Sequence, residues 1–444
     1  MTNDLIKQLA TLIQEKGGKA YYVGGYVRDL FLGYQSKDID IEVHGINEET
    51  LLEVLKQLGT PLEYGKSFGI YSIKGTNIDI ALPRKEIKTG EGHRDFDVEV
   101  KPNISLKDAA SRRDFTINSM MLDILTNELI DPFDGKKDLE NKIIRHVNET
   151  SFIEDPLRIF RAAQFSSRFN FEIAQETIEL CKTMDETSLS KERIEAELKK
   201  ALLEANKPSL FFDSLAKMNK LDYWFKEIKE AIGYEQNPLK HPEGDLYKHT
   251  MMVLDEGVLY RNEVSNSYNF MVLLLVHDLG KLKTKIMTDE GIHFYGHENC
   301  LDKANDLLDR IISNSDTKEY VREMIPKHMM GHRIFKYNMD EYESNKWFTG
   351  IKNPKDLVYL ATSDKSNHRD PNRIKFLMNR YEIFKDLENK PSLTGNDLIA
   401  NGIEPNDRFS EYLDYAYDLK LQGKEYSEIL ELTLAYINDQ KGDK

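Results

Sequence analysis

Two aspartates, Asp38 and Asp40, alternate with isoleucines in a stretch that is typical of a β-strand. Successive side chains of a strand point to opposite faces, so we expect both carboxylates on one face while Ile39 and Ile41 enter the core. Mg²⁺ prefers oxygen ligands and commonly joins one or two carboxylates to substrate phosphates. The pair therefore predicts metal-assisted attack on a nucleoside triphosphate, with both aspartates as catalytic metal ligands. The alternative is an edge strand with solvated acids.

Two adjacent glycines, Gly24 and Gly25, lie upstream of this pair and precede a short predicted helix that carries Arg28. Adjacent glycines allow a sharp turn and a close approach of the backbone to a ligand. The first turn of a helix offers unpaired N–H groups to an anion. We therefore expect this corner, with Arg28, to bind the triphosphate.

A second polar cluster combines Arg112, Arg113, Asp114 and Asn118 at the start of a predicted helix. Guanidinium groups match phosphate and ribose oxygens with two parallel hydrogen bonds. The cluster predicts a binding site for the triphosphate or for a sugar hydroxyl. A surface ion-pair network at a helix start would use the same residue types.

A third cluster, Asp155, Arg158 and Arg161, opens another predicted helix, with Asp155 and Arg158 one turn apart on one face. Adenine and cytosine each present an exocyclic amine beside a ring-nitrogen acceptor, whereas guanine and uracil present the opposite order. A carboxylate accepts hydrogen bonds and a guanidinium donates them, so the pair predicts selection of ATP and CTP. Alternatively, Asp155 is only an N-cap before Pro156.

A separate set of metal-ligating residue types, His249, His277, Asp278 and Asp364, lies in the second half of the chain. Histidine and aspartate on separate helices can chelate a transition metal or Mg²⁺ that activates water against a phosphoester. The pair His277-Asp278 follows an apolar run and precedes Leu-Gly-Lys. His297 and His328 are candidate additional ligands, whereas isolated histidines are more often structural.

The composition describes a multidomain globular chain. A length of 444 residues predicts two to four domains, and 40% apolar with 31% charged residues is ordinary for such proteins. Because no apolar run reaches the length of a membrane span and no signal peptide is visible, we expect no membrane association. Two cysteines give no disulfide framework, which favours a reducing cytoplasm. The net charge of −15 restricts any RNA site to a local basic patch.

Hydrophobic periodicity predicts the elements that position these clusters. We expect helices at 4–15, 50–58, 190–200 and 208–232, strands at 20–23, 38–43, 62–73 and 77–81, a mobile loop at 83–100 and a linker at 236–245. Asp79, on the predicted strand after Asp40's, is a candidate third acid. These elements predict a small mixed α/β sheet followed by a mostly helical chain.

The stretch Gly24-Gly25-x-Val27-Arg28-Asp29-x-x-Leu32-Gly33, followed by Asp38-Ile39-Asp40, resembles the head motif of polymerase-β-type nucleotidyltransferases. More closely, it is similar to class II tRNA nucleotidyltransferases and bacterial poly(A) polymerases. Segments 111–120, 131–139, 154–162 and 190–200 match successive motifs of this family, and the second-half cluster resembles HD-domain phosphohydrolases. The resemblance implies an α+β fold with a nucleotidyltransferase head at 1–125, a helical neck and body at 126–235, an HD domain at 236–390 and a helical tail at 391–444.

The resemblance implies an enzyme that adds CCA to the 3′ end of tRNA from CTP and ATP, without a template and with Mg²⁺ in the head. It implies a metal-dependent phosphohydrolase in the HD domain, with Ni²⁺, Mn²⁺, Co²⁺ or Mg²⁺. Segment 64–69 is closer to the CCA-adding type, and the chain departs from common members at Glu42 and His44. The alternatives are an A-adding or poly(A) polymerase, an HD hydrolase with a degenerate head, and a non-catalytic RNA-binding protein.

Overall fold

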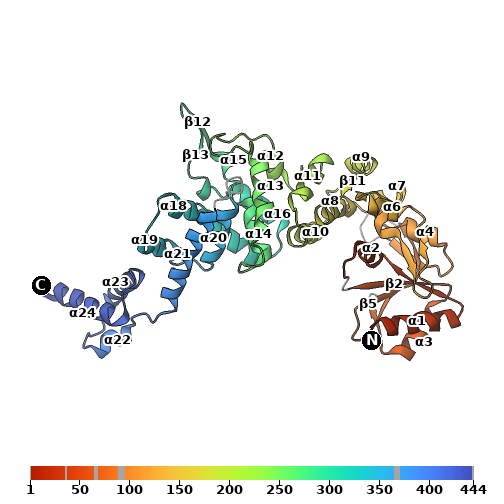
Figure 1. Ribbon diagram of the computed structural model, residues 1–444, viewed down its shortest axis with the longest axis horizontal. Helices are drawn as coiled ribbons and strands as arrows, with labels where there is room; N and C mark the ends of the chain where they lie inside the picture. The colour runs from red at the N-terminus through yellow and green to blue at the C-terminus, as the bar shows by residue number, and fades with distance from the viewer. Residues whose placement is uncertain (1, 36–37, 65–68, 89–95, 365–370, 443–444) are drawn as a thin grey trace. The chain divides into compact units, whose positions relative to one another are not determined.

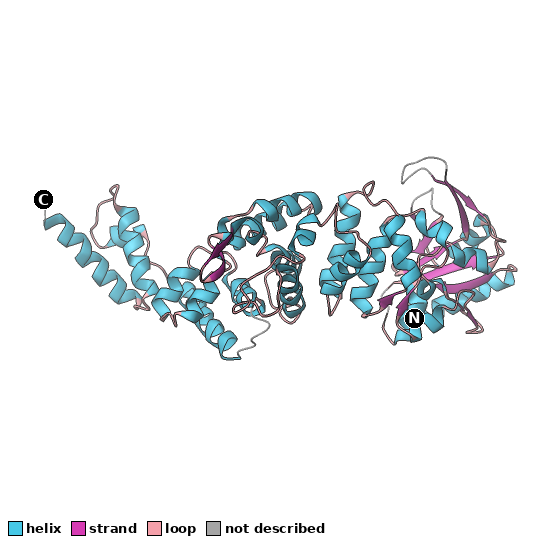
Figure 2. Cartoon of the chain, turned by 90° about the horizontal axis from the view of Figure 1, so that it is seen from above, coloured by secondary structure: helices cyan, strands magenta, loops and turns pink. Residues whose placement is uncertain are grey.

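The computed structural model describes residues 2–35, 38–64, 69–88, 96–364 and 371–442. The chain divides into two compact units, Met1–Tyr223 and Trp224–Lys444 (Figure 1). The large sheet belongs to the first unit, while the second is built almost entirely from helices (Figure 2). The predicted α+β class is confirmed. Segment 64–69, which suggested the CCA-adding type, lies mostly outside the described residues.

The first unit is organised around a seven-stranded sheet with the order β3-β4-β5-β2-β1-β8-β9. The strands are β1 Lys19–Val23, β2 Ile39–His44, β3 Pro61–Tyr64, β4 Ile70–Ile73, β5 Ile78–Ala81, β8 Met121–Asp123 and β9 Leu129–Ile130. Strands β2 and β5 are parallel and the other pairs are antiparallel. Strand β2, which carries Asp40, is therefore central and is not the solvated edge strand of the alternative, whereas Asp38 is exposed and lies directly before this strand.

Helices α1 Thr2–Glu15 and α3 Glu48–Leu58 lie side by side against one face of the sheet (Figure 1). Both are amphipathic, and their apolar stripes bury Leu9 and Val54 with Ile41 and Val43 of β2 in one core. Because side chains alternate along β2, its acidic residues leave on the opposite face. The sheet therefore has the apolar core on one face and the acidic residues of β2 on the other.

Two predictions about the head strands were wrong. Residues 62–73 form two strands, β3 and β4, which pair with each other antiparallel. The segment 83–100, predicted as a mobile loop, contains strands β6 Arg84–Lys88 and β7 Phe96–Val100, which also pair. In both segments, contacts between the two paired strands stabilise an extended conformation that the local periodicity of the sequence predicts only weakly.

The rest of the first unit is mostly helical, with one pair of short strands. Its elements are α2 Gly25–Leu32, α4 Leu106–Ser111, α5 Thr116–Ser119, α6 Gly135–Glu140, β10 Ile143–Ile144, α7 Glu149–Ile153, α8 Leu157–Phe169, β11 Glu172–Ile173, α9 Gln175–Thr183, α10 Lys191–Glu204 and α11 Ser209–Lys217. Helix α8 packs against both α10 and α11. It buries Phe160 and Ala163 completely, which fixes the direction of its arginines. The predicted helical run at 208–232 is broken between α11 and α12 Lys226–Ala231.

The second unit continues with α13 Leu246–Gly257, α14 Ser267–Val276, α15 Lys281–Thr284, β12 Lys285–Thr288, β13 Gly291–Phe294, η1 His297–Asn299, α16 Asp302–Ile311, α17 Ser315–Met324, η2 Ile325–Lys327, α18 Met330–Lys336, α19 Glu341–Phe348, α20 Pro354–Ser363, α21 Pro371–Asn389, α22 Gly395–Ala400, α23 Phe409–Leu421 and α24 Tyr426–Gly442. Helix α14 is the apolar run before His277. Because it is apolar on all sides, it is buried, and every residue from Phe270 to Val276 lies in the interior. None of the described helices is long and apolar enough to cross a membrane.

The predicted linker at 236–245 lies within the second unit, not between the two units. Gln236 and Asn237 are buried, and an isolated bridge joins Glu235 to Asp245. Polar and turn-forming residues are typical of linkers, but here their side chains form hydrogen bonds to other parts of the second unit. Asn237, for example, donates to the carbonyl oxygen of Ile292 in β13.

Candidate active sites

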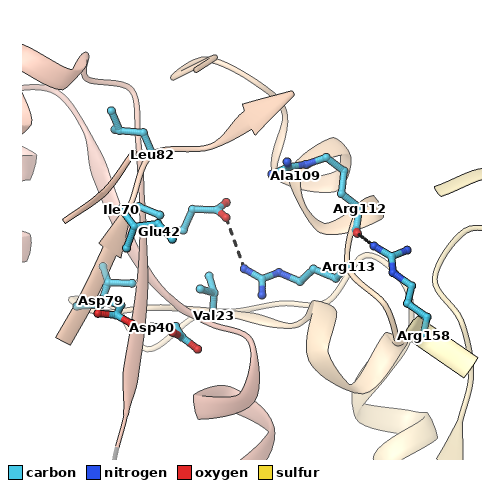
Figure 3. Close-up of a pocket in the computed structure, with 12 residues that line it drawn as sticks. Val23, Asp40, Glu42, Ile70, Asp79, Leu82, Ala109, Arg112, Arg113 and Arg158 are labelled. Carbon is cyan, nitrogen blue, oxygen red and sulfur yellow. Dashed lines mark hydrogen bonds and ion pairs between the residues drawn. The ribbon is translucent and has the colours of Figure 1, made fainter. Parts of the chain in front are cut away.

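The polar face of the head sheet opens into a cavity of about 410 Å³ lined by Asp40, Glu42, Asp79, Arg112, Arg113 and Arg158, among others (Figure 3). Asp40 and Asp79 are register partners on the parallel strands β2 and β5, and their carboxylates lie next to each other. Burial raises the pKa of Asp40; Arg113 opposes this shift, and Asp79 and Asp38 add to it. A divalent cation would relieve this concentration of negative charge, so the residues present fit Mg²⁺.

Glu42 continues the strand alternation of Asp38 and Asp40 and was not predicted as a site residue. Its side chain is buried, bonds His44 at 2.8 Å and lies 3.5 Å from the guanidinium of Arg113 (Figure 3). Although burial works against its charge, the bond to His44 and the charge of Arg113 lower the pKa of Glu42. Glu42 therefore stays ionised and holds Arg113 over the cavity. The period of two along β2 was the signal that could have found it.

Gly24 has a positive φ of 67°, a conformation that favours glycine. A Cβ at this position would lie 3.0 Å from Arg113 Nη1 and 3.3 Å from an oxygen of Asp40. The turn therefore brings the start of α2 against both Asp40 of β2 and Arg113. Binding of the triphosphate by Gly24 and Gly25 stays a prediction.

Four predicted site residues form one hydrogen-bonded chain. Arg28 donates to Asn118 Oδ1 at 2.8 Å, and the amide of Asn118 donates to Asp114 Oδ1 at 2.9 Å. Arg161 of α8 donates twice to Asp114 Oδ2, at 2.6 and 2.8 Å. Burial alone would raise the pKa of Asp114, but Arg161 and the Asn118 amide lower it to about 2. The structure thus connects α2, α5 and α8 through one carboxylate.

The side chains of Asp155 and Arg158 are not bonded to each other, although the backbone N–H of Arg158 donates to the carbonyl oxygen of Asp155 at 3.0 Å. Asp155 accepts from Arg193 of α10 at 3.1 Å and from the backbone N–H of Leu157 at 3.2 Å. Arg158 donates to the carbonyl oxygens of Ser151 and Arg112, at 2.8 and 2.7 Å. A guanidinium has five N–H donors, so these two bonds orient Arg158 and leave further donors. Arg193, which orients Asp155, was quoted in the 190–200 motif but was not predicted as a site residue.

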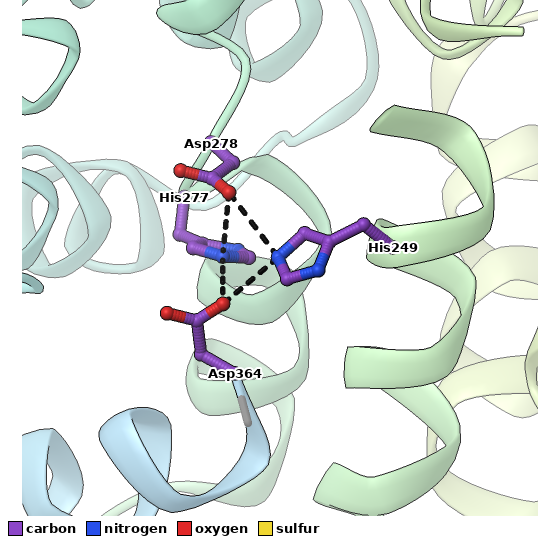
Figure 4. Close-up of side chains that lie close together, drawn as sticks. All are labelled: His249, His277, Asp278 and Asp364. Atoms are coloured by element: carbon purple, nitrogen blue, oxygen red, sulfur yellow. Dashed lines mark ion pairs between the residues drawn. The ribbon is translucent and has the colours of Figure 1, made fainter. Parts of the chain in front are cut away.

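The second unit gathers His249, His277, Asp278 and Asp364 in its interior (Figure 4). They come from α13, the end of α14 and the end of α20, and one ligand atom from each lies within 4.8 Å of the others. His249 Nε2 is 2.8 Å from Asp364 Oδ1 and 3.2 Å from Asp278 Oδ2. All four residues are buried. The four positions predicted from residue type and order therefore converge.

The orientation of the two histidine rings favours metal binding. His249 Nδ1 is bonded to Glu243 at 2.7 Å, and His277 Nδ1 to the carbonyl oxygen of Leu274 at 2.9 Å. The buried atoms His249 Nε2, His277 Nε2 and Asp364 Oδ1 converge without a hydrogen-bond partner of acceptable geometry among the described residues, beside Asp278 Oδ2, which forms an ion pair with Lys281. Metal-ligating histidines commonly tie down one ring nitrogen in this way and present the other to the ion. The residues present therefore fit a divalent transition metal.

Four supporting groups, from Glu243, Lys281, His332 and Arg373, were not predicted as site residues, and of these only Lys281 stood in a quoted motif. Glu243 also bonds His241, at 2.9 Å, and the charge of Lys281, 2.6 Å away, helps to hold the pKa of Asp278 well below its usual range despite burial. His332 lies 2.5 Å from Asp364 Oδ2, and Arg373 contacts the other ring nitrogen at 2.6 Å. These partners keep both carboxylates ionised and oriented.

Comparison with known proteins gives sequence relatives that cover most of the chain. A family model described as the poly A polymerase head domain matches residues 20–145. A multifunctional CCA protein of Acinetobacter baumannii (strain ATCC 17978) is 35% identical over 323 residues, which cover 71% of this chain and 75% of that protein. A multifunctional CCA protein of Haemophilus influenzae (strain PittGG) is 39% identical over 294 residues, covering 64% and 68% respectively.

Solved structures share the fold. A Thermotoga maritima CCA-adding enzyme complexed with tRNA aligns with a TM-score of 0.68 at 23% identity, over 98% of this chain and 95% of that one. A CCA-adding enzyme in complex with CTP aligns with a TM-score of 0.67 at 23% identity, over 98% and 95%. This likeness extends from the sheet through the helical units, so the predicted succession of a mixed head and helical parts is confirmed.

The buried ion pair at Asp114 predicts a specific pH dependence of stability. Its folded pKa of about 2 lies below the ordinary 3.8, so its contribution is present above about pH 4 and is lost as the pH falls toward 2. We expect Asp114→Asn to lower the free energy of unfolding by about 2 kcal/mol at pH 7, and the gap to the wild type to shrink below pH 4.

Urea unfolding at a series of pH values measures this gap. Asp134→Asn is the control, because Asp134 is exposed and its side chain makes no cap hydrogen bond. A gap that stays constant between pH 7 and pH 3 would contradict the assignment of Asp114 as the ionised centre of the network.

Proposed function

Because the chain belongs to the class II tRNA nucleotidyltransferases, the family of the multifunctional CCA proteins, we propose that it adds C, C and A to the 3′ end of tRNA. CTP and ATP are the substrates, and no nucleic-acid template is used. The observation that carries the proposal is Asp40 on a central strand whose polar face opens into an arginine-lined cavity, with Asp38 directly before this strand. We place the reaction in the cytoplasm, since tRNA is the acceptor and both cysteines are free.

In this proposal Asp38 and Asp40 hold divalent cations next to the start of α2. Bound there, Mg²⁺ would favour ionisation of the attacking 3′-hydroxyl and neutralise charge on the α-phosphate and the pyrophosphate leaving group. Arg113, held by Glu42, and Arg112 are positioned to contact the triphosphate. These arginines bind phosphate oxygens in fixed directions, which aligns the nucleotide for in-line attack.

Base selection belongs to Asp155 and Arg158 in this proposal. Arg193 orients Asp155, and two backbone carbonyls orient Arg158, so both groups are held before a nucleotide arrives. Asp155 retains lone pairs for an exocyclic amine, and Arg158 retains donors for a ring nitrogen or a carbonyl oxygen. Cytosine and adenine offer this amine beside an acceptor, whereas guanine and uracil do not.

A second function, metal-dependent phosphoester hydrolysis, is favoured by the buried cluster of the second unit. A cavity of about 320 Å³ reaches Asp278 and Asp364 and is also lined by Lys240, Lys281 and Arg333. Cationic side chains beside a metal centre suit a phosphate-bearing substrate. We propose that this unit hydrolyses small nucleotides or 2′,3′-cyclic phosphates with Ni²⁺, Mn²⁺, Co²⁺ or Mg²⁺. A hydrolase with a degenerate head is disfavoured, because the head retains both aspartates and its ordered arginines.

The two activities are expected to be separable by mutation. Asp40→Asn keeps the side-chain shape but loses the charge, so nucleotide addition should fall roughly a thousandfold or more while hydrolysis stays unchanged. His277→Ala with Asp278→Ala should remove hydrolysis and spare addition. Addition is measured with tRNA transcripts ending before the first C and ending in CC, and hydrolysis with 2′,3′-cyclic nucleotides and p-nitrophenyl phosphodiesters. Each assay uses the four metals in turn, before and after chelation.

Circular dichroism and thermal unfolding serve as folding controls for these variants. Near wild-type addition by Asp40→Asn would refute the metal assignment in the head. Long poly(A) products with the CC-ending transcript would favour the poly(A) alternative.

The proposed role of Asp155 makes a prediction about selectivity. Asp155→Ala removes the acceptor for the base amine, so incorporation of UTP and GTP should rise 10- to 100-fold relative to CTP and ATP, on the order of 1–3 kcal/mol. Incorporation of each triphosphate alone measures this ratio. Arg193→Gln is the matched comparison, because it releases Asp155 without removing it and should weaken selection less. If both variants keep full selectivity, Asp155 serves only to anchor the start of α8.

A further inference from the structure

Tyr34 is an exposed aromatic residue whose backbone is fixed to the end of α2. It is 58% exposed, and it lines a cavity of about 830 Å³ in the first unit. Gly33 ends the helix with a positive φ of 74°, and the N–H of Tyr34 donates to the carbonyl oxygen of Asp29 at 2.9 Å. Such a bond across a left-handed glycine is a common C-terminal cap of helices. The cap therefore determines where the Tyr34 side chain leaves the backbone.

Tyr34 forms the exposed end of a stack of three aromatic rings. Its ring is nearly parallel to that of Phe169, at an angle of 17° and with the centroids 6.5 Å apart. Phe169 is stacked in turn on the buried Phe165 of α8, with the centroids 5.8 Å apart. The guanidinium of Arg28 lies over Phe169, 4.7 Å from its centroid, which also holds this ring in place. Because most of Tyr34 remains exposed, a further flat ring can join the stack at this end.

The cavity beside the stack also contains the proposed metal-binding carboxylates. Tyr34 and Phe169 line it together with Asp38 and Asp40. Its volume of about 830 Å³ lies in the range of small-molecule sites, so it can hold a nucleotide. A nucleotide whose base stacks on Tyr34 therefore has its ribose in the same cavity as the two aspartates.

The charges along this cavity disfavour a triphosphate. Both arginines of its described lining are already paired, Arg28 with Asp29 at 2.6 Å and Arg168 with Glu204 at 3.1 Å. Because the two metal-binding aspartates also line it, carboxylates outnumber guanidinium groups. The arginine-lined cavity of the candidate active site suits the triphosphate better. The terminal base and ribose of an acceptor strand are uncharged, so they fit the cavity beside Tyr34.

The proposed reaction needs an acceptor site that tolerates different bases. Each nucleotide added to the tRNA becomes the acceptor of the next one, so the terminal base changes as the CCA end grows. A site that recognised this base through hydrogen bonds would reject some of the termini. Stacking on an aromatic ring accepts every base, because every base has a flat π face. The stack that ends at Tyr34 has this property.

We propose that Tyr34 stacks on the base of the 3′-terminal nucleotide of the acceptor RNA and thereby positions its 3′-hydroxyl beside Asp38 and Asp40. Tyr34 is a positioning residue for the acceptor, whereas Asp155 and Arg158 select the incoming base. The inference rests on the proposed nucleotide addition and names the group that holds the second substrate of that reaction.

The experiment uses two acceptors that differ only in their last base. One is a tRNA transcript ending in CC, and the other has a last nucleotide that keeps its ribose and 3′-hydroxyl but lacks the base. The measurement is kcat and KM for addition of A from ATP by the full-length protein. Loss of the base should lower kcat/KM of the wild type about 10- to 100-fold, mainly through KM for the acceptor.

Tyr34→Ala should show a similar loss with the normal acceptor. With the base-free acceptor it should lose little more, because the contact between ring and base is already absent. Tyr34→Phe keeps an aromatic ring and should restore most of the wild-type kcat/KM. A tyrosine that only supports the fold would lower the activity on both acceptors by the same factor.

Phe31→Ala is the matched control, because Phe31 is an exposed aromatic residue of the same helix, with the ammonium of Lys136 5.6 Å from its ring centroid. It should keep the wild-type difference between the two acceptors. Equal kcat/KM of the wild type on both acceptors would overturn the proposal without any variant. Losses that multiply in Tyr34→Ala would also overturn it, because the base would then contact another group. If the wild type adds no A to the normal acceptor, the proposed nucleotide addition itself is refuted.

Discussion

The buried carboxylate of Asp114 is the interaction on which the geometry of the head depends. One of its oxygens accepts from Asn118, which in turn accepts from Arg28 of α2, and the other accepts from Arg161 of α8. Removing one member of such a buried pair leaves a charge without a partner, which destabilises the fold. The ionised carboxylate of Asp114 therefore holds three parts of the head in one arrangement: the glycine turn, the arginine cluster and the helix proposed to select the base.

The two candidate active sites use opposite strategies for holding a metal. In the head, Asp38 and Asp79 are exposed and Asp40 is partly buried, so substrate phosphates and water must complete the coordination. In the second unit all ligands are buried, and each histidine is oriented by a bond to its second nitrogen. A cation bound in the head would therefore depend on the substrate for part of its coordination, whereas one bound in the second unit would be enclosed by protein ligands.

The residues that carry the chemistry could be predicted from the sequence where their positions depend on a local sequence pattern. Strand alternation places Asp40, and residue type and order identify the cluster around His277, because both signals survive without knowledge of the tertiary structure. Partners supplied from elsewhere could not be predicted: Arg193 reaches Asp155 from a helix 38 residues away, and the turn residues around Glu243 resemble a linker although they support His249. The hairpins at 62–73 and 83–100 were missed because strand pairing is set by contacts between segments, which local periodicity does not show.

The central claim, that Asp114 makes the arginine network act as a unit, is tested most directly by a double-mutant cycle. The measurement is kcat/KM for CTP addition to a tRNA transcript that ends before the first C, with Asp114→Asn, Arg161→Gln and both together. If the ion pair acts as a unit, the double variant should lose little more activity than either single variant, with a coupling on the order of 1–3 kcal/mol. Losses that add in the double variant would contradict the account.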